Sequence, residues 1–321
     1  MNSSDKVFVA GHRGLVGSAI VRALEAEGFR NLVLRTHKEL DLEDQASVRR
    51  FFDSERPTHV VMAAARVGGI LANNSYRAEF IYNNLVIQSN VIDAAWRSGV
   101  ARLLFLGSSC IYPRDCPQPM KEEYLLTGPL EHTNEPYAVA KIAGIKMCEA
   151  YNSQYGTSFA SVMPTNLYGP NDNFDLASSH VLPALLRKVH EAKVSGAGKF
   201  TVWGSGTPKR EFLHVDDMAL ACIHVMKRAD FKDMVNIGSG DEVSIRQLAE
   251  LICDVVGFAG SLEFDASKPD GTPRKLLDIQ KLRAMGWRPT ISLRDGIRRT
   301  YEWFLHSPYA LPIKSTGRAI G

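Results

Sequence analysis

The segment "LFLGSSCIYP", Leu104 to Pro113, ends an apolar run with two hydroxyls, a thiol and a phenol. A strand that leads directly into reactive side chains is typical of a functional site, because such sites gather on loops held by a rigid scaffold. A cysteine after a strand is most often a packing residue, so Cys110 alone does not indicate catalysis. Ser108, Ser109 and Cys110 are therefore candidates whose roles depend on what the fold brings beside them.

Tyr137 and Lys141 stand four positions apart in "NEPYAVAKIAGIKMCEAYNSQYG". We expect this stretch to form one long helix, capped by Thr133 or Asn134 and ending near Gly156. The phenol and the ammonium then share one face. A phenol with a pKa near 10 is a weak acid-base catalyst at neutral pH, but an ammonium one turn away stabilises its phenolate. The pair is a candidate for proton transfer, although this spacing also occurs by chance in helices.

A glycine-rich turn, "GHRGLVG", follows the apolar run "KVFVA" and precedes an amphipathic segment. Gly11, Gly14 and Gly17 allow the backbone to turn sharply and approach a pyrophosphate, which the free N–H groups of a helix N-terminus stabilise. Neighbouring glycines are often plain turn residues. The strand before and the helix after favour a dinucleotide site.

The second expected strand, "NLVLR", ends in Arg35. An NAD site usually has an acid there to hold the ribose 2'-hydroxyl, whereas arginine favours a 2'-phosphate. With Arg13 and either His37 or Lys38 nearby, we predict NADP(H) as the cofactor. The alternative is a solvated "RTHK" turn.

Short apolar runs that alternate with segments of helical period must position these residues. The alternation predicts an α/β fold with a Rossmann-type, doubly wound parallel sheet covered by helices on both faces. From about Tyr168 the pattern loosens into Pro-, Gly- and Asn-rich stretches such as "YGPNDNFDLASSH" and "KPDGTPRK". Two later pieces return to the first domain: "REFLHVDDMALACIHVMK", a helix opened by Asp216 and Asp217, and the strand "MVNIGS".

We therefore expect two domains, the second of them smaller, discontinuous and C-terminal. The NADP-binding domain comprises residues 1–170 and 211–240, and the substrate domain comprises residues 171–210 and 241–321.

Composition excludes several classes of partner. Of 321 residues, 45% are hydrophobic and 23% charged, and a formal net charge of +3 gives no basic footprint for nucleic acid or a membrane surface. No secretion signal or apolar run of about 18 residues is evident, which favours a cytoplasmic protein. The five cysteines form no CxxC pair and the histidines no HExxH motif, so we expect no disulfide framework and no metal site.

Five motifs together, "GHRGLVG", "GSS", "YAVAK", "PTNLYGP" and "REFLHVDD", resemble the extended short-chain dehydrogenase/reductase family in the expected order along most of the chain. The resemblance implies a hydride-transfer triad of Ser108, Tyr137 and Lys141, with Ser108 preferred to Ser109 because it directly follows Gly107. The implied cofactor contacts are Gly11, Arg13, Gly14, Leu15, Val16, Gly17, Arg35, His37, Asp41, Leu42, Ala63, Lys141, Pro164, Asn166, Leu167 and His180.

Within that family, "GSSCIYP", "NEPYAVAKIAGIK", "MPTNLYGPNDNF" and "FDASKPDGTPRKLLD" look like members that epimerise and reduce GDP-4-keto-6-deoxy-D-mannose with NADPH. In a 4-keto sugar, removal of a hydrogen from C3 or C5 gives an enolate that donors near O4 stabilise. Inversion requires proton return from the opposite face, hence two acid-base groups. The resemblance implies Cys110 and His180.

The same resemblance implies GDP-sugar contacts and an oligomeric state. The contacts are Lys188, Trp203, Arg210, Asp270 and Lys275. A tryptophan in the core and a charged loop are the alternatives for these residues. Family members commonly form homodimers through a four-helix bundle, for which the helices around Asn83–Ser98 and Tyr137–Tyr155 are the candidates.

Four other functions stay open. A nucleotide-sugar 4,6-dehydratase is disfavoured because Cys110 and Ile111 follow the serines where an acid pair is usual. A 4-epimerase with tightly bound NAD is disfavoured by Arg35 and Cys110, while a simple 4-reductase needs no epimerising pair. A non-catalytic NADP sensor has no need for Ser108, Tyr137 and Lys141 together.

Overall fold

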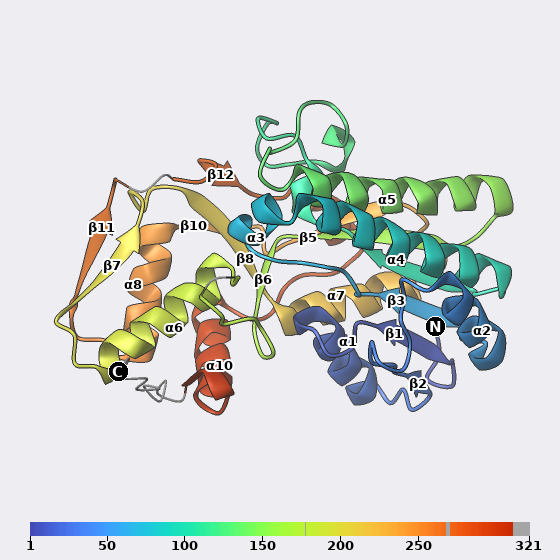
Figure 1. The fold of residues 1–321 in the computed structure, drawn as a ribbon, viewed down its shortest axis with the longest axis horizontal. Coiled ribbons are helices and arrows are strands. Elements are labelled where there is room, and N and C mark those ends of the chain that lie inside the picture. Colours follow the sequence, from blue (N-terminus) through green and yellow to red (C-terminus); the bar gives the residue numbers. More distant parts are fainter. Residues whose placement is uncertain (177, 268–269, 311–321) are drawn as a thin grey trace, which may run out of the picture.

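A six-stranded parallel sheet forms the larger part of the computed structural model, which describes residues 1–176, 178–267 and 270–310 (Figure 1). The strands are β1 (Val7–Ala10), β2 (Leu32–Val33), β3 (His59–Met62), β4 (Arg102–Leu106), β5 (Phe159–Pro164) and β9 (Met234–Ile237), in the order β2-β1-β3-β4-β5-β9. Because the chain moves from β1 to one side and then returns to the other, the sheet is doubly wound. Such sheets bind ligands beyond the carboxyl ends of the strands at this reversal. The predicted α/β fold is confirmed.

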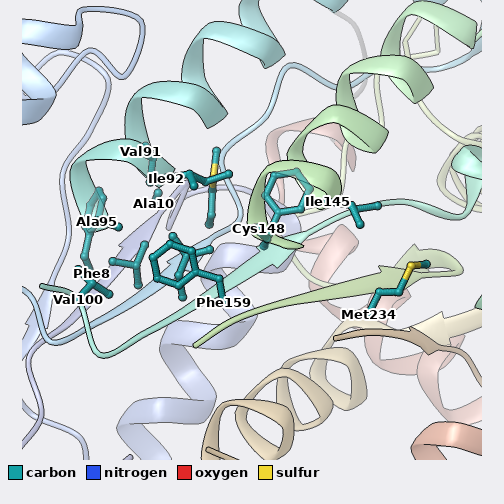
Figure 2. Close-up of a cluster of buried hydrophobic side chains, with 14 of the residues drawn as sticks. Phe8, Ala10, Val91, Ile92, Ala95, Val100, Ile145, Cys148, Phe159 and Met234 are labelled. Atoms are coloured by element: carbon teal, nitrogen blue, oxygen red, sulfur yellow. The ribbon is translucent and has the colours of Figure 1, made fainter. Parts of the chain in front are cut away.

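Helices cover both faces of this sheet (Figure 1). One face carries α2 (Gln45–Glu55), α4 (Arg77–Arg97) and α5 (Glu135–Tyr155), and the other carries α1 (Leu15–Ala26) and α7 (Val215–Lys227). Alternate residues of a strand point to opposite faces. Phe8 and Phe159 thus pack with Ile145 and Cys148 under α4 and α5 (Figure 2), whereas Val9 belongs to the core under α1 and α7.

Helix α5 has the bounds that the sequence predicts. Pro136 lies in its first turn and Gly156 ends it with a φ of 70°, a left-handed conformation that favours glycine. Asn134 occupies the N-cap position, but its side chain caps no N–H group. At Gly144 a Cβ atom would lie 2.3 Å from the Phe105 ring, so glycine lets this helix approach β4 closely.

The smaller part contains the remaining strands and three helices. Strand β8 (Lys209–His214) pairs with β6 (Asn166–Tyr168), β10 (Glu242–Ser244) and β12 (Arg274–Lys275), and β7 (Lys199–Trp203) pairs with β11 (Ser261–Asp265). Its helices are α6 (Val181–Val194), α8 (Ile245–Val256) and α10 (Leu293–Leu305), which enclose a core around Phe174, Leu186 and Phe304. Short elements are α3 (Ile70–Ser75), α9 (Gln280–Ala284) and the 3-10 turns at Ser109–Ile111, Glu122–Tyr124 and Pro308–Ala310.

Two expectations need comment. The segment predicted as a helix near Asp216 is α7, but the residues before it form β8 of the second sheet, because their buried apolar side chains complete that sheet. Residues 311–321, the end of the expected second domain, lie outside the described residues. Among the helices of the described residues, none has both the length and the apolar character needed to cross a membrane.

Candidate active site

The glycine turn after β1 has the geometry of a phosphate cradle. Gly11 has a φ of 83°, and a Cβ there would lie 2.7 Å from the Ala64 nitrogen. A Cβ on Gly17 would lie 2.1 Å from the Gly11 carbonyl oxygen, so both positions require glycine. The N–H of Gly14 donates to that same oxygen at 3.0 Å, and α1 begins at Leu15. The residues present therefore fit a dinucleotide pyrophosphate at the start of α1.

Arg35 lies after β2 as predicted, but its guanidinium already has a partner. It donates to Glu55 Oε1 at 2.5 Å and lies 5.9 Å from the centre of the Phe51 ring. The other oxygen of Glu55 accepts from Lys6 at 2.7 Å. The cation is thus directed along α2, while Arg13 in the glycine turn is exposed.

The other predicted cofactor residues lie in three places. His37 and Asp41 form an exposed pair 3.7 Å apart in the loop after β2, and Leu42 packs on the core under α4 and α5. Ala63 follows β3, and its N–H donates to the Ala10 carbonyl at 3.0 Å. At the β5–β6 connection, Pro164 ends β5, Leu167 packs on the α1–α7 core, and Asn166 Nδ2 donates to the Glu211 carbonyl at 2.8 Å.

Ser108, Tyr137 and Lys141 meet where β4 ends against the first turns of α5. The hydroxyl of Ser108 accepts from the Cys110 N–H at 3.4 Å, and its interaction with the Tyr137 phenol lowers the pKa of that phenol. Lys141 is buried and donates to the Leu106 carbonyl at 2.7 Å, with its ammonium 5.7 Å from the centre of the Tyr137 ring. The predicted triad is therefore one cluster.

Burial sets the protonation of this cluster. It raises the pKa of Tyr137, and the Ser108 hydrogen bond opposes that rise only in part. Burial lowers the pKa of Lys141 to about 8. At neutral pH the phenol therefore holds a proton that it can donate, and Lys141 is charged below a pH of about 8.

Cys110 and His180 lie on different elements, the 3-10 turn after β4 and the start of α6. Burial raises the pKa of the Cys110 thiol, while Lys275, Ser108 and Lys141 each lower it. Burial lowers the pKa of His180, and Lys275 lowers it further. His180 stands at the N-cap of α6 with its residue surface exposed, yet enough protein surrounds its ring to disfavour the charged form.

The predicted GDP-sugar contacts come from several segments of the smaller part. Trp203 is 68% exposed, so it is not a core residue, and the Lys188 ammonium lies 5.0 Å from the centre of its ring. Arg210 donates to the Thr272 carbonyl at 2.6 Å. The carboxylate of Asp270 accepts from the N–H and hydroxyl of Ser205 at 3.0 and 2.7 Å. Lys275 lies opposite Arg210 in the β12–β8 pairing, and burial lowers the pKa of its ammonium.

Two buried residues that the sequence did not single out hold the segments of the site together. Glu211 is 0% exposed and accepts from the N–H groups of Gly240 at 2.7 Å and Leu277 at 3.0 Å. Asn236, also 0% exposed, accepts from the Tyr112 hydroxyl at 2.6 Å. An asparagine inside the apolar run "MVNIG" is a signal, since a buried amide needs partners.

Comparison with known proteins identifies a family and several relatives with related names. Residues 7–238 match the NAD dependent epimerase/dehydratase family. The chain is 62% identical over 304 residues to GDP-L-fucose synthase 1 of Arabidopsis thaliana, covering 95% of this chain and 94% of that protein. It is 58% identical over 314 residues to GDP-L-fucose synthase of Escherichia coli K12, covering 95% and 98%. A GDP-L-fucose synthetase from Naegleria fowleri, solved with NADP bound, is 33% identical with a TM-score of 0.89, covering 95% and 94%.

Proposed function

The chain belongs to the NAD dependent epimerase/dehydratase family, and within it we propose that it converts GDP-4-keto-6-deoxy-D-mannose into GDP-L-fucose. It inverts C3 and C5 and then reduces C4 with NADP(H) as cofactor. The observation that carries the proposal is the position of Cys110 beside Ser108, whose hydroxyl accepts from the Cys110 N–H at 3.4 Å, next to the buried Lys141 and the Tyr137 ring. One ketone oxygen held by Ser108 and Tyr137 then serves both reactions.

In the epimerisation, Ser108 and Tyr137 donate to O4 and stabilise the enolate that forms when C3 or C5 loses its proton. Cys110 and His180 remove and return that proton from opposite faces of the ring. A thiol and an imidazole suit this exchange because their ordinary pKa values, about 8.5 and 6.5, lie near neutral pH. The GDP sugar is bound by five side chains of the smaller part: Lys188, Trp203, Arg210, Asp270 and Lys275.

In the reduction, Tyr137 donates its proton to O4, and Lys141 stabilises the phenolate that remains. The ammonium of Lys141 is positioned for this by its hydrogen bond to the Leu106 carbonyl. NADPH supplies the hydride for C4 when it is bound. Gly11, Gly14 and the start of α1 hold its pyrophosphate, and Arg13 and Arg35 neutralise the 2'-phosphate.

We also propose that the two parts of the chain bind different ligands. Residues 1–170 and 211–240 bind NADP(H), and residues 171–210 and 241–321 bind the GDP sugar. The fit of the glycine turn to a pyrophosphate supports the first assignment, and the exposed Trp203 beside Lys188 supports the second.

The test is turnover of GDP-4-keto-6-deoxy-D-mannose with NADPH in deuterated water, followed by location of deuterium in the product. We expect NADPH oxidation and deuterium at both C3 and C5. Oxidation without deuterium at these carbons would show a simple 4-reductase. Purification of the protein with stoichiometric NAD would instead favour a 4-epimerase.

The chain forms a homodimer through α4 and α5 in this proposal. These helices pack against each other, and their outer surface exposes Tyr82 by 64% and Val139 by 40%. A four-helix bundle with a second copy would cover such apolar side chains. Light scattering at micromolar concentration should give twice the chain mass, and a monomer mass would contradict the dimer.

A further inference from the structure

The short strand β12 carries two cations that lie opposite two cations of β8. The register of this pairing places Arg274 across from Lys209 and Lys275 across from Arg210. Like charges directly opposite each other on neighbouring strands destabilise the pairing of those strands. A strand of two residues contributes few ladder bonds of its own, so other contacts must hold β12 in this place.

Only one of these two cation pairs has an acid beside it. Glu242 of β10 accepts from the Arg274 guanidinium at 2.7 Å and from the Lys209 ammonium at 3.4 Å. Arg210 and Lys275 form no ion pair within 4 Å in the part of the chain that the structure describes. Burial lowers the pKa of the Lys275 ammonium, and the Arg210 guanidinium is among the charges that lower it further. The pair of Arg210 and Lys275 is therefore suited to an anion from outside the chain.

Two successive residues of β8 hold the segment that carries Lys275 from its two ends. Before Lys275, the Thr272 carbonyl accepts from the Arg210 guanidinium at 2.6 Å. After Lys275, the Leu277 N–H donates to Glu211 Oε2 at 3.0 Å. Lys275 thus lies between two contacts that start from adjacent residues of β8.

The Glu211 carboxylate accepts hydrogen bonds on both of its oxygens. The residue is 0% exposed, and its Oε1 accepts from the Gly240 N–H at 2.7 Å. A Cβ atom on Gly238 would lie 2.2 Å from Oε1, so the turn after β9 closes tightly on this carboxylate. Hydrogen bonds to a charged group that is shielded from water are stronger than exposed ones. The segment after Lys275 is therefore fixed to β8 by a strong contact.

The main chain of Glu211 bonds the cofactor side of the site. Its carbonyl accepts from Asn166 Nδ2 at 2.8 Å, and Asn166 is one of the predicted cofactor contacts. The side chain and the main chain of Glu211 therefore bond different halves of the site. A change of the carboxylate alone leaves the bond to Asn166 in place.

We propose that Glu211 is a positioning residue for the GDP sugar, whose carboxylate holds Lys275 opposite Arg210 so that the diphosphate binds to both cations. This assignment rests on the proposed function for the identity of the ligand. The guanidinium of Arg210 matches two phosphate oxygens, and Lys275 adds a second positive charge. The diphosphate offsets the repulsion between the cations once it is bound. Glu211 acts through the strand and not by contact with the sugar, because its side chain is fully buried.

Hydrogen–deuterium exchange of the protein without ligand tests the positioning directly. The test variant is Glu211→Gln, because glutamine keeps the shape but places an NH2 group against one of the two N–H donors. Peptides that span residues 271–279 should exchange about tenfold faster in this variant, while peptides from β1 and α5 keep the wild-type protection. Faster exchange in all peptides would overturn the proposal, since Glu211 would then support only the stability of the whole fold.

Two further variants complete this experiment. Gly238→Ala keeps the charge of Glu211 but crowds its Oε1, so it should give the same local increase in exchange and serves as the test if Glu211→Gln does not fold. Glu263→Gln is the matched control. It removes the same charge from an exposed site of the smaller part, paired with Lys199 at 3.2 Å, and it should leave exchange and GDP binding unchanged.

Calorimetry with GDP and turnover give the second readout. In Glu211→Gln, the Kd of GDP and the KM of the GDP sugar should rise about tenfold, while kcat and the Kd of NADPH stay within about threefold of the wild type. Unchanged GDP affinity in a folded variant would overturn the proposal, as would an equal loss of affinity for GDP and NADPH. A wild-type protein that binds GDP but does not turn over the GDP sugar would refute the proposed function, while GDP binding and exchange would still test Glu211.

Discussion

The groups for reduction and the groups proposed for epimerisation are built in different ways. Tyr137 and Lys141 come from one helix, which Gly144 brings against the Phe105 ring. Cys110 and His180 come from a 3-10 turn after β4 and from the start of α6. The first group depends on one helix and its packing. The second depends on the alignment of two segments that are far apart in the chain.

This difference suggests how the two reactions can be separated. A change within α5 affects the proton given to O4 and leaves the two segments that carry Cys110 and His180 in place. A change in those segments affects proton exchange at C3 and C5 and leaves the phenol on its helix. Each prediction below tests whether the two regions are independent to this degree.

Tyr137→Phe should have the largest effect. The phenylalanine ring fills the same space beside Phe80, whose ring centre lies 6.4 Å away, so the fold should be retained. Loss of the proton donor should slow NADPH oxidation about 10³-fold, within the range for a lost general acid. Deuterium exchange at C3 and C5, followed by mass spectrometry, should fall about tenfold or less, because Ser108 still donates to O4. Equal loss of both activities would contradict the separation of the two regions.

Cys110→Ser should give the opposite result. A serine hydroxyl is a poor base at neutral pH, so exchange at C3 and C5 should fall about 10²-fold. NADPH oxidation should continue and yield a product with C3 and C5 unchanged, which nuclear magnetic resonance would identify. Cys253→Ser, a buried thiol of α8 in the smaller part, is the matched control. Deuterium exchange at C3 and C5 at the wild-type rate in Cys110→Ser would show that this thiol packs in the structure and takes no part in proton exchange.

The sequence predicted the first region better than the second for a physical reason. Helical period, a proline in the first turn and a terminal glycine are local signals, and they predicted the bounds of α5 and hence the shared face of Tyr137 and Lys141. The alternation of apolar runs and helical segments likewise predicted the parallel sheet covered by helices on both faces. These features depend on residues that are near one another in the chain.

Lys275, Glu55 and Asn236 could not be placed in this way. The loop "KPDGTPRK" carries no period, and the pairing of its end with β8 is a contact between distant segments. The same is true of the Arg35–Glu55 ion pair and of the bonds from Asn236 to Tyr112. Resemblance assigned Lys275 to the GDP sugar, and that assignment stays a prediction.

The pH dependence of reduction should follow Lys141. Burial lowers its pKa to about 8, so it is charged below that pH and loses its charge above it. The rate of NADPH oxidation should therefore be level from about pH 6 to 8 and fall by up to about tenfold per pH unit above 8. Lys141→Arg should remove this fall at the cost of a lower rate, since arginine stays protonated. A profile that stays level to pH 10 would show that the charge of Lys141 is not needed.

Asp172 lies in the loop that leads to His180, so its titration tests the stability of the second region. Its side chain is buried, Oδ2 has no partner among the described residues, and burial raises its pKa to about 7. In the unfolded chain the pKa is about 3.9, so the folded state binds more protons between these values. Stability contributed by the neutral carboxyl is thus full below about pH 4 and is lost as the pH rises to about 7.

Asp172→Asn should remove this pH dependence. At pH 8 the variant should be more stable than the wild type by about 1 kcal/mol, and the difference should shrink toward pH 4. Urea unfolding at pH 8 and pH 5 measures it, with Asp53→Asn, an exposed site on α2, as the control. A constant difference at both pH values would show that Asp172 is not neutral in the folded protein at low pH.

Arg35→Ala should have the smallest effect. It tests how strongly the preference for NADPH depends on the Arg35 guanidinium. The guanidinium of Arg35 is already shared with Glu55, which also accepts from Lys6, so Arg35 adds only part of its charge to a 2'-phosphate. We expect the preference for NADPH over NADH, measured as a ratio of kcat/KM, to fall about threefold, the scale of an exposed ion pair. Arg13→Ala removes an exposed cation of the glycine turn. It should lower the same ratio by about tenfold. If Arg35→Ala instead abolishes the preference for NADPH, the Arg35 guanidinium must leave Glu55 when the cofactor binds. The cofactor site would then rearrange on binding.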